Sequence, residues 1–87
     1  MSKIQDCADL IITTMTFCDK ENKNRNFSVM NGIFESMLIF LDYDDLIDIV
    51  KNRVIPNFQP NVNEYWFEYI NGRLKYWDEC DNEEKER

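Results

Sequence analysis

Carboxylate and tryptophan side chains, gathered in two short segments, are the residues of this chain best suited to chemistry or recognition. They are Asp42, Asp44, Asp45, Asp48, Glu64, Trp66, Glu68 and Trp77. Carboxylates can bind metal ions, move protons or pair with a basic partner, and tryptophan is enriched at the energetic centres of protein interfaces. We expect these eight residues to bind a partner, because nothing beside them completes a catalytic or metal-binding set.

The residues that enzymes commonly use together with carboxylates are missing from the sequence. The chain has no histidine and only two glycines, which removes the usual general base and the glycine-rich loop that binds phosphates. A calcium-binding loop beginning at Asp42 would need an oxygen ligand where Leu46 stands and a glycine where Ile47 stands. We therefore expect no catalytic residue, no metal and no cofactor, and a protein that is not an enzyme.

The net charge indicates what kind of partner the chain can have. The formal net charge is −7 at pH 7, and residues 78–87, with six acidic and two basic side chains, contribute −4 of it. This balance disfavours binding to nucleic-acid phosphates or to anionic membrane surfaces, and it favours a basic protein partner. We expect residues 1–77 to form a single small domain and residues 78–87 to form an acidic, disordered tail.

The first residues of the chain and its cysteines favour a cytoplasmic location. The sequence does not open on a basic region followed by an apolar run, and no apolar run approaches the roughly eighteen residues that span a membrane. The three cysteines, Cys7, Cys18 and Cys80, are an odd number without a C-x-x-C pair. That usage is typical of reduced thiols in a reducing compartment.

Apolar residues at helical spacing predict two helices in the first half of the chain. Ser2 and Gln5 predict a capping box at the start of the first helix, at about residues 3–18. The polar segment 19–26 predicts an exposed loop. The second helix, at about residues 28–41, is apolar around most of its circumference, so we expect it to be central or to carry a homodimer contact.

A third helix is predicted at about residues 44–54. Asp44 can cap its N-terminus, and its acidic first turn and basic last turn match the helix dipole. Pro56 should end the helix at or before Ile55.

The Asn71–Gly72 pair predicts a tight turn between two strands of a β-hairpin, at about residues 64–70 and 73–78. The expected fold is therefore α+β, with three helices followed by a hairpin that packs on them. On one face of the hairpin lie the residues expected to be buried, which are Phe67, Tyr69, Leu74 and Tyr76. The opposite face carries Trp66 and Trp77, which are the aromatic part of the expected binding surface.

The same segment also fits a single helix over residues 62–79, which gives an all-α four-helix bundle. Gly72 would then cost about 1 kcal/mol relative to alanine, and Arg73 would interrupt the apolar face. In that fold the division into a buried face and a tryptophan face fails, and the aspartates between Asp42 and Asp48 become the better candidate site.

Small size, acidity, the lack of catalytic residues and aromatic residues beside carboxylates favour an inhibitor of a basic protein. The most concrete version is an immunity protein or antitoxin that covers the active or substrate-binding surface of a nuclease-type toxin, because acidic surfaces steer association with basic ones. Two alternatives stay open. One is a phage-encoded antagonist that mimics DNA and blocks a host DNA-binding or defence complex. The other is a small homodimeric regulatory or assembly subunit that pairs through the helix at residues 28–41.

Overall fold

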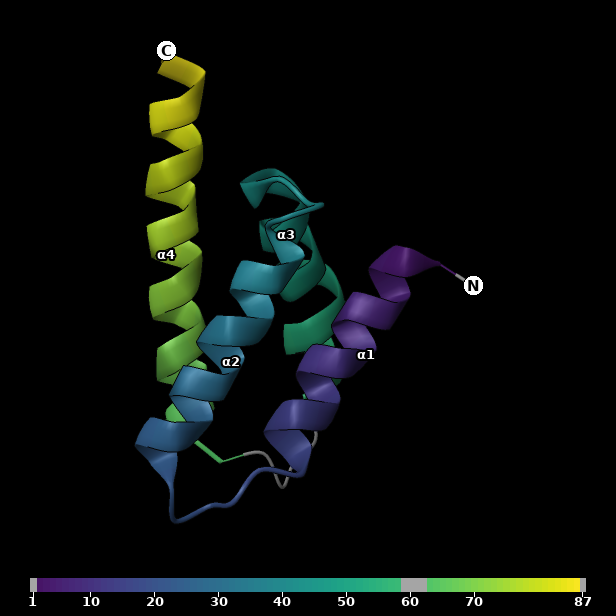
Figure 1. The fold of residues 1–87 in the computed structure, drawn as a ribbon, viewed down its shortest axis with the longest axis vertical. Coiled ribbons are helices and arrows are strands. Elements are labelled where there is room, and N and C mark those ends of the chain that lie inside the picture. Colours follow the sequence, from purple (N-terminus) through teal and green to yellow (C-terminus); the bar gives the residue numbers. More distant parts are fainter. Residues whose placement is uncertain (1, 59–62, 87) are drawn as a thin grey trace.

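The computed structural model describes residues 2–58 and 63–86, and the elements within those ranges are all helices (Figure 1). In chain order they are α1 (Lys3–Thr16), α2 (Lys23–Met37), α3 (Tyr43–Ile49), the π-helix η1 (Val50–Val54), the 3₁₀ turn η2 (Ile55–Asn57) and α4 (Tyr65–Glu86). The predicted α+β fold with a C-terminal hairpin is therefore wrong. The alternative, an all-α protein of four helices, is confirmed.

The expected hairpin is instead the first half of α4, which passes through Asn71 and Gly72 without a turn. No described glycine has a positive φ, which the predicted turn would require. Trp66, Ile70 and Trp77 follow one another at intervals of four and seven residues, so they share one helical face, and each is at most 1 % exposed. Burying a large apolar side chain contributes about 1.5–3 kcal/mol, which outweighs the cost of a glycine inside the helix.

The residues expected on the buried face of the hairpin are consequently displaced from the core. Phe67 is 43 % exposed and Tyr76 is 52 % exposed, while Tyr69 and Leu74 are partly buried. The two-residue period of a β-strand predicted that all four side chains lie on one face. The 3.6-residue period of an α-helix distributes them around α4 instead.

Residues 78–86, expected to be a disordered tail, form the last turns of α4. This part of the helix is not wholly exposed, because Asp81 is only 8 % exposed. Residue 87, the last of the predicted tail, lies outside the described residues.

The first helix begins at Lys3 as predicted, but only half of the predicted capping box forms, because the side chain of Gln5 bonds to Asp9 and Arg53 and not to Ser2. The backbone N–H of Gln5 donates to Oγ of Ser2, the N-cap residue, over 3.5 Å. The helix ends at Thr16, two residues before the predicted end.

The second helix begins at Lys23, inside the segment expected to be a loop, because a buried asparagine anchors its first turn. Asn26 is 7 % exposed, and its Nδ2 atom donates to the backbone oxygen of Asp19 over 2.7 Å and to the hydroxyl of Tyr65 over 2.9 Å. Asn26 precedes the buried Met30 by one helical turn, so the inward face of α2 starts with a polar residue. The helix ends at Met37, not near residue 41.

The third helix is capped by Asp42, not by Asp44 as predicted. The N–H of Asp42 donates to Oδ2 of Asp45 over 3.1 Å. After Ile49 the chain widens into η1, where the N–H of Ile55 donates to the carbonyl of Val50, five residues earlier. Pro56 has no N–H and its ring crowds the carbonyl four residues before it, which accounts for the wider turn.

Aromatic side chains of α2 and α4 pack together and join the core. The ring of Phe34 meets Trp77 edge-on with centroids 4.8 Å apart, and Phe27 meets Trp66 edge-on at 5.4 Å. Phe27 also stacks on Tyr69 at 4.4 Å. Among the described residues no group accepts a hydrogen bond from the buried Nε1 of Trp66, so packing alone holds this indole.

Replacing Gly72 by alanine should raise the free energy of unfolding by about 1 kcal/mol, because a helical alanine is favoured over glycine by that amount. The added Cβ meets nothing within 4 Å. The measurement is urea denaturation followed by circular dichroism. In a hairpin turn the same change would destabilise the protein, so a loss of stability would contradict the helix.

Candidate functional site

The two tryptophans predicted to meet a partner lie inside the protein. Trp66 is 0 % exposed and Trp77 is 1 % exposed, so neither side chain is available to a partner. The acidic residues from the same segment, Glu64 and Glu68, are exposed at the start of α4. The structure therefore separates the carboxylates from the tryptophans with which they were expected to act.

The aspartates before and within α3 are exposed, and most of them take part in local structure. Asp42 and Asp45 cap the helix, and Oδ1 of Asp48 accepts a hydrogen bond from Nδ2 of Asn52 over 2.5 Å. These contacts explain why aspartates stand at these positions without requiring a ligand.

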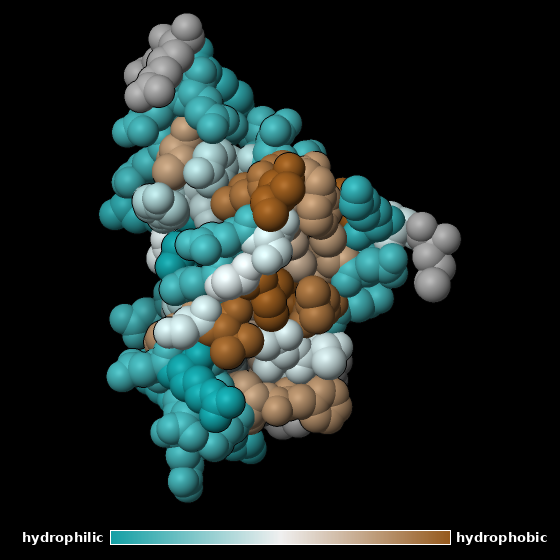
Figure 2. Space-filling view, in the orientation of Figure 1, coloured by the Kyte–Doolittle hydropathy of each residue, from teal (hydrophilic) through white to brown (hydrophobic). Residues whose placement is uncertain are grey.

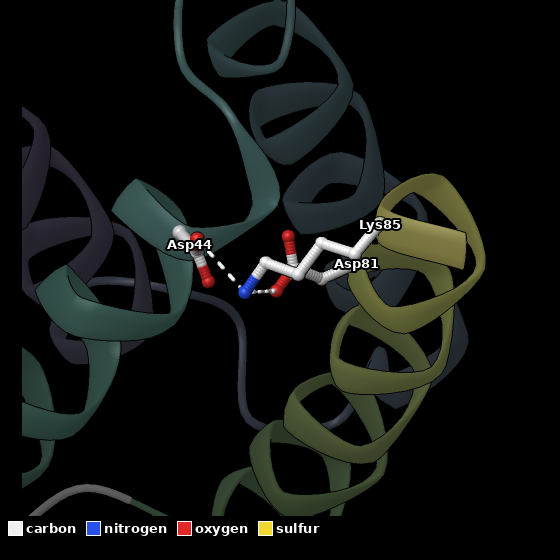
Figure 3. Close-up of polar contacts among 3 residues, drawn as sticks. All are labelled: Asp44, Asp81 and Lys85. Atoms are coloured by element: carbon white, nitrogen blue, oxygen red, sulfur yellow. Dashed lines mark ion pairs between the residues drawn. The ribbon is translucent and has the colours of Figure 1, made fainter. Parts of the chain in front are cut away.

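Asp44 belongs to a different arrangement, an ion-pair cluster with Asp81 and Lys85 that joins α3 to α4 (Figure 3). Nζ of Lys85 lies 3.0 Å from Oδ2 of Asp81 and 3.4 Å from Oδ2 of Asp44. The hydrogen bond from Lys85 holds the pKa of Asp81 below its ordinary value, and the same bond raises the pKa of Lys85. The cluster fastens the C-terminal turns of α4 beside the start of α3.

A prominent apolar surface lies elsewhere, along the seam between α1 and α2. Figure 2 shows hydrophobic side chains gathered there, on the face that Figure 1 presents to the viewer. A groove of about 680 Å³ runs between the two helices, with the buried Cys7 and Met37 in its lining. Its exposed walls include Leu10, Val29 and Phe40, each 48–49 % exposed.

A second hollow, of about 420 Å³, continues this groove toward the loop between α1 and α2. Val29 lines both hollows, so they are adjacent. Phe17, which is 81 % exposed, lines the second hollow. We call the two hollows together the α1–α2 groove.

Both ends of the α1–α2 groove carry one basic and one acidic side chain. At one end are Lys3 and Asp6, with Nζ of Lys3 lying 4.3 Å from the centroid of the Phe40 ring. At the other end are Asp19 and Arg25. The groove is therefore mainly apolar in its first hollow, has the polar Thr13, Thr14 and Asn26 in the lining of its second, and is mixed in charge at its ends.

The sequence pattern identified only one wall of this groove. The apolar second helix was expected to be central or to form a contact, but the contribution of α1 was not predicted. The apolar stripe that predicted the first helix consists of Ile4, Cys7, Ala8, Ile11, Met15 and Cys18. Leu10 and Phe17 lie off this stripe, and two large apolar residues off it are the signal that could have identified the second wall.

Charge is divided unequally between the two halves of the chain. Residues 1–41 have five acidic and four basic residues, a net charge of −1, whereas residues 42–87 have twelve and six, a net charge of −6. The α1–α2 groove thus belongs to a nearly neutral half, and the half with α3 and α4 carries almost all of the acidic excess.

Neither a metal site nor a membrane span is found in residues 2–58 and 63–86. No group of three or more His, Cys, Asp or Glu side chains there is placed to hold a metal ion. None of the helices in these ranges is long and apolar enough to cross a bilayer. Comparison with protein families, with curated proteins and with solved structures finds no match for this chain.

Replacing Lys85 by glutamine should destabilise the protein near neutral pH, because both of its ion pairs are lost. The pKa of Asp81 is lowered on folding, so this contribution is present above the ordinary value of 3.8 and is lost as the pH falls through the lowered pKa. We expect the difference in unfolding free energy between wild type and variant to be small, because Lys85 is exposed, and to disappear in acid. Urea denaturation as a function of pH measures it.

The matched control is Lys75→Gln, which removes the same charge from an exposed site on the same helix. A difference that persists unchanged to the lowest pH, or that is equal for the two variants, would contradict the role given to the ion-pair cluster.

Proposed function

We propose that this chain is a small, non-enzymatic regulatory or assembly subunit that acts by binding a protein chain in the α1–α2 groove. The observation that carries this proposal is the continuous apolar groove, whose walls hold three large side chains, Leu10, Val29 and Phe40, half exposed to water. Contiguous apolar surface with a polar rim is typical of protein interaction sites.

The shape of the groove favours an occupant that is a helix, or that presents two rows of side chains to the groove. Two antiparallel helices with exposed apolar residues on their facing edges form the kind of cleft into which an amphipathic helix packs. The half-exposed residues make the walls, and the buried Cys7 and Met37 make the floor, so an occupant would cover the walls without displacing the core.

A cytoplasmic location is part of the proposal. Its support is that Cys7, Cys18 and Cys80 are all free thiols. Unpaired cysteines are the usual state in a reducing compartment.

A second candidate function uses the other half of the protein. The net charge of −6 over residues 42–87 fits an inhibitor of a basic protein, either an immunity protein or antitoxin for a nuclease-type toxin or a DNA mimic that blocks a DNA-binding complex. Such a partner would be drawn to the exposed carboxylates of α3 and α4, not to the groove. The two functions therefore predict different sensitive residues.

The test is affinity capture from the native host with a tagged chain in three forms. The groove variant carries Leu10→Gln and Val29→Gln, and the control carries Glu68→Lys and Glu79→Lys on exposed positions of α4. We expect the wild type and the control to retain the same protein chain, which can be an untagged copy or another protein, and the groove variant to lose it. Circular dichroism verifies that all three are folded.

The opposite pattern decides against the groove. If the captured protein is basic, is lost with the Glu68→Lys and Glu79→Lys control and is retained by the groove variant, the chain acts through its acidic half and the second candidate function replaces the first.

A further inference from the structure

Resting on the proposed function, we propose that the occupant of the α1–α2 groove is a second copy of this chain, packed face to face about a two-fold axis. Three features of the described residues support a second copy: the distribution of net charge, the pairing of charges at the ends of the groove, and the apolar side chains between them.

The distribution of charge determines where two copies can meet. Each chain has a net charge of −7, so two copies repel one another unless their contact lies where the excess is smallest. That place is the half formed by residues 1–41, with a net charge of −1, and the α1–α2 groove lies within it. None of the residues that line the groove belongs to residues 42–87, which carry the remaining −6.

The ends of the groove are complementary to each other. A two-fold axis that lies in the plane of the interface and crosses the groove places each end of one copy over the opposite end of the other. Lys3 and Asp6 of one copy then face Asp19 and Arg25 of the second, so one basic and one acidic side chain lie opposite one acidic and one basic side chain. Because the contact is two-fold, this set of pairs occurs twice.

The apolar centre of the groove also matches itself. Val29 lines both hollows and therefore lies near the middle, where residues close to a two-fold axis meet their own equivalents. Leu10 on the opposite wall is half exposed, and the second copy would cover it as well. Removing such side chains from water is the main favourable term in association.

The test uses the two glycines of the chain as a matched pair. Gly32 lines the groove, Gly72 lies on α4 away from it, both are exposed, and a Cβ at either meets nothing within 4 Å. Leucine at either position improves helix propensity, so both variants should fold at least as well as the wild type. Only Gly32→Leu fills the groove.

Sedimentation equilibrium at micromolar concentrations should show a dimer for the wild type and for Gly72→Leu. Gly32→Leu should raise the dimer dissociation constant by roughly tenfold or more, because a side chain fills the space of the second copy. Its thermal midpoint, extrapolated to low concentration, should not fall.

The end-to-opposite-end arrangement has its own test in charge reversal. Asp6→Arg should weaken the dimer because it places two like charges together, and Asp6→Arg combined with Arg25→Asp should restore it. A double variant that dimerises no better than the single one would overturn this arrangement.

The outcomes separate the second copy from the proposed function. A wild-type chain that stays monomeric, while Gly32→Leu loses a different captured protein, overturns the second copy and leaves the groove as the binding site. A monomeric wild type whose captured protein is unaffected by Gly32→Leu overturns both. Equal weakening of the dimer by both glycine variants overturns the second copy on this face.

Discussion

The packing of one face of α4 against the aromatic residues of α2 is the constraint on which the rest of the structure depends. Trp66, Ile70 and Trp77 are essentially inaccessible, and Phe27 and Phe34 of α2 meet the two indoles edge-on. A chain of 87 residues buries a smaller fraction of its surface than a larger one, so two fully buried tryptophans are a large share of its core. In the structure residues 65–77 belong to α4, and the helix turns both tryptophans toward α2.

That constraint also determines what becomes of the acidic residues. A helix that places Trp66 and Trp77 inward continues past residue 77, and its next inward turn brings Asp81 beside the start of α3. There Lys85 bridges Asp81 and Asp44. Two carboxylates that the sequence pattern assigned to a binding epitope and to a disordered tail, Asp44 and Asp81, therefore help to hold α4 beside α3. The exposed carboxylates that remain give residues 42–87 their negative charge.

The sequence predicted the first three helices but not their exact extents, and it did not decide the fourth. Local signals were sufficient where one residue controls one end, as Ser2 does for α1 and as Pro56 does beyond α3. They failed at Asn26, which forms hydrogen bonds with Asp19 and Tyr65 inside the fold. In the sequence, such a buried polar residue looks the same as a polar residue of a loop. They failed at Asn71–Gly72 because turn propensity is a local preference of about 1 kcal/mol, and the packing that overrides it comes from Phe27 and Phe34, more than thirty residues earlier in the chain.

The candidate site was hidden from the sequence for a related reason. A groove needs two walls, and the spacing of apolar residues in one helix says nothing of which helix lies beside it. α4 packs on the side of α2 that carries Phe27 and Phe34, while Val29 of α2 and Phe40, which follows the helix, line the groove beside α1. Leu10, Val29 and Phe40 remain about half exposed, so polar residues at these positions would cost the fold far less than they would in the core. The proposed contact with a second copy would cover these apolar side chains, and it would lie in the near-neutral half of a chain whose net charge is −7.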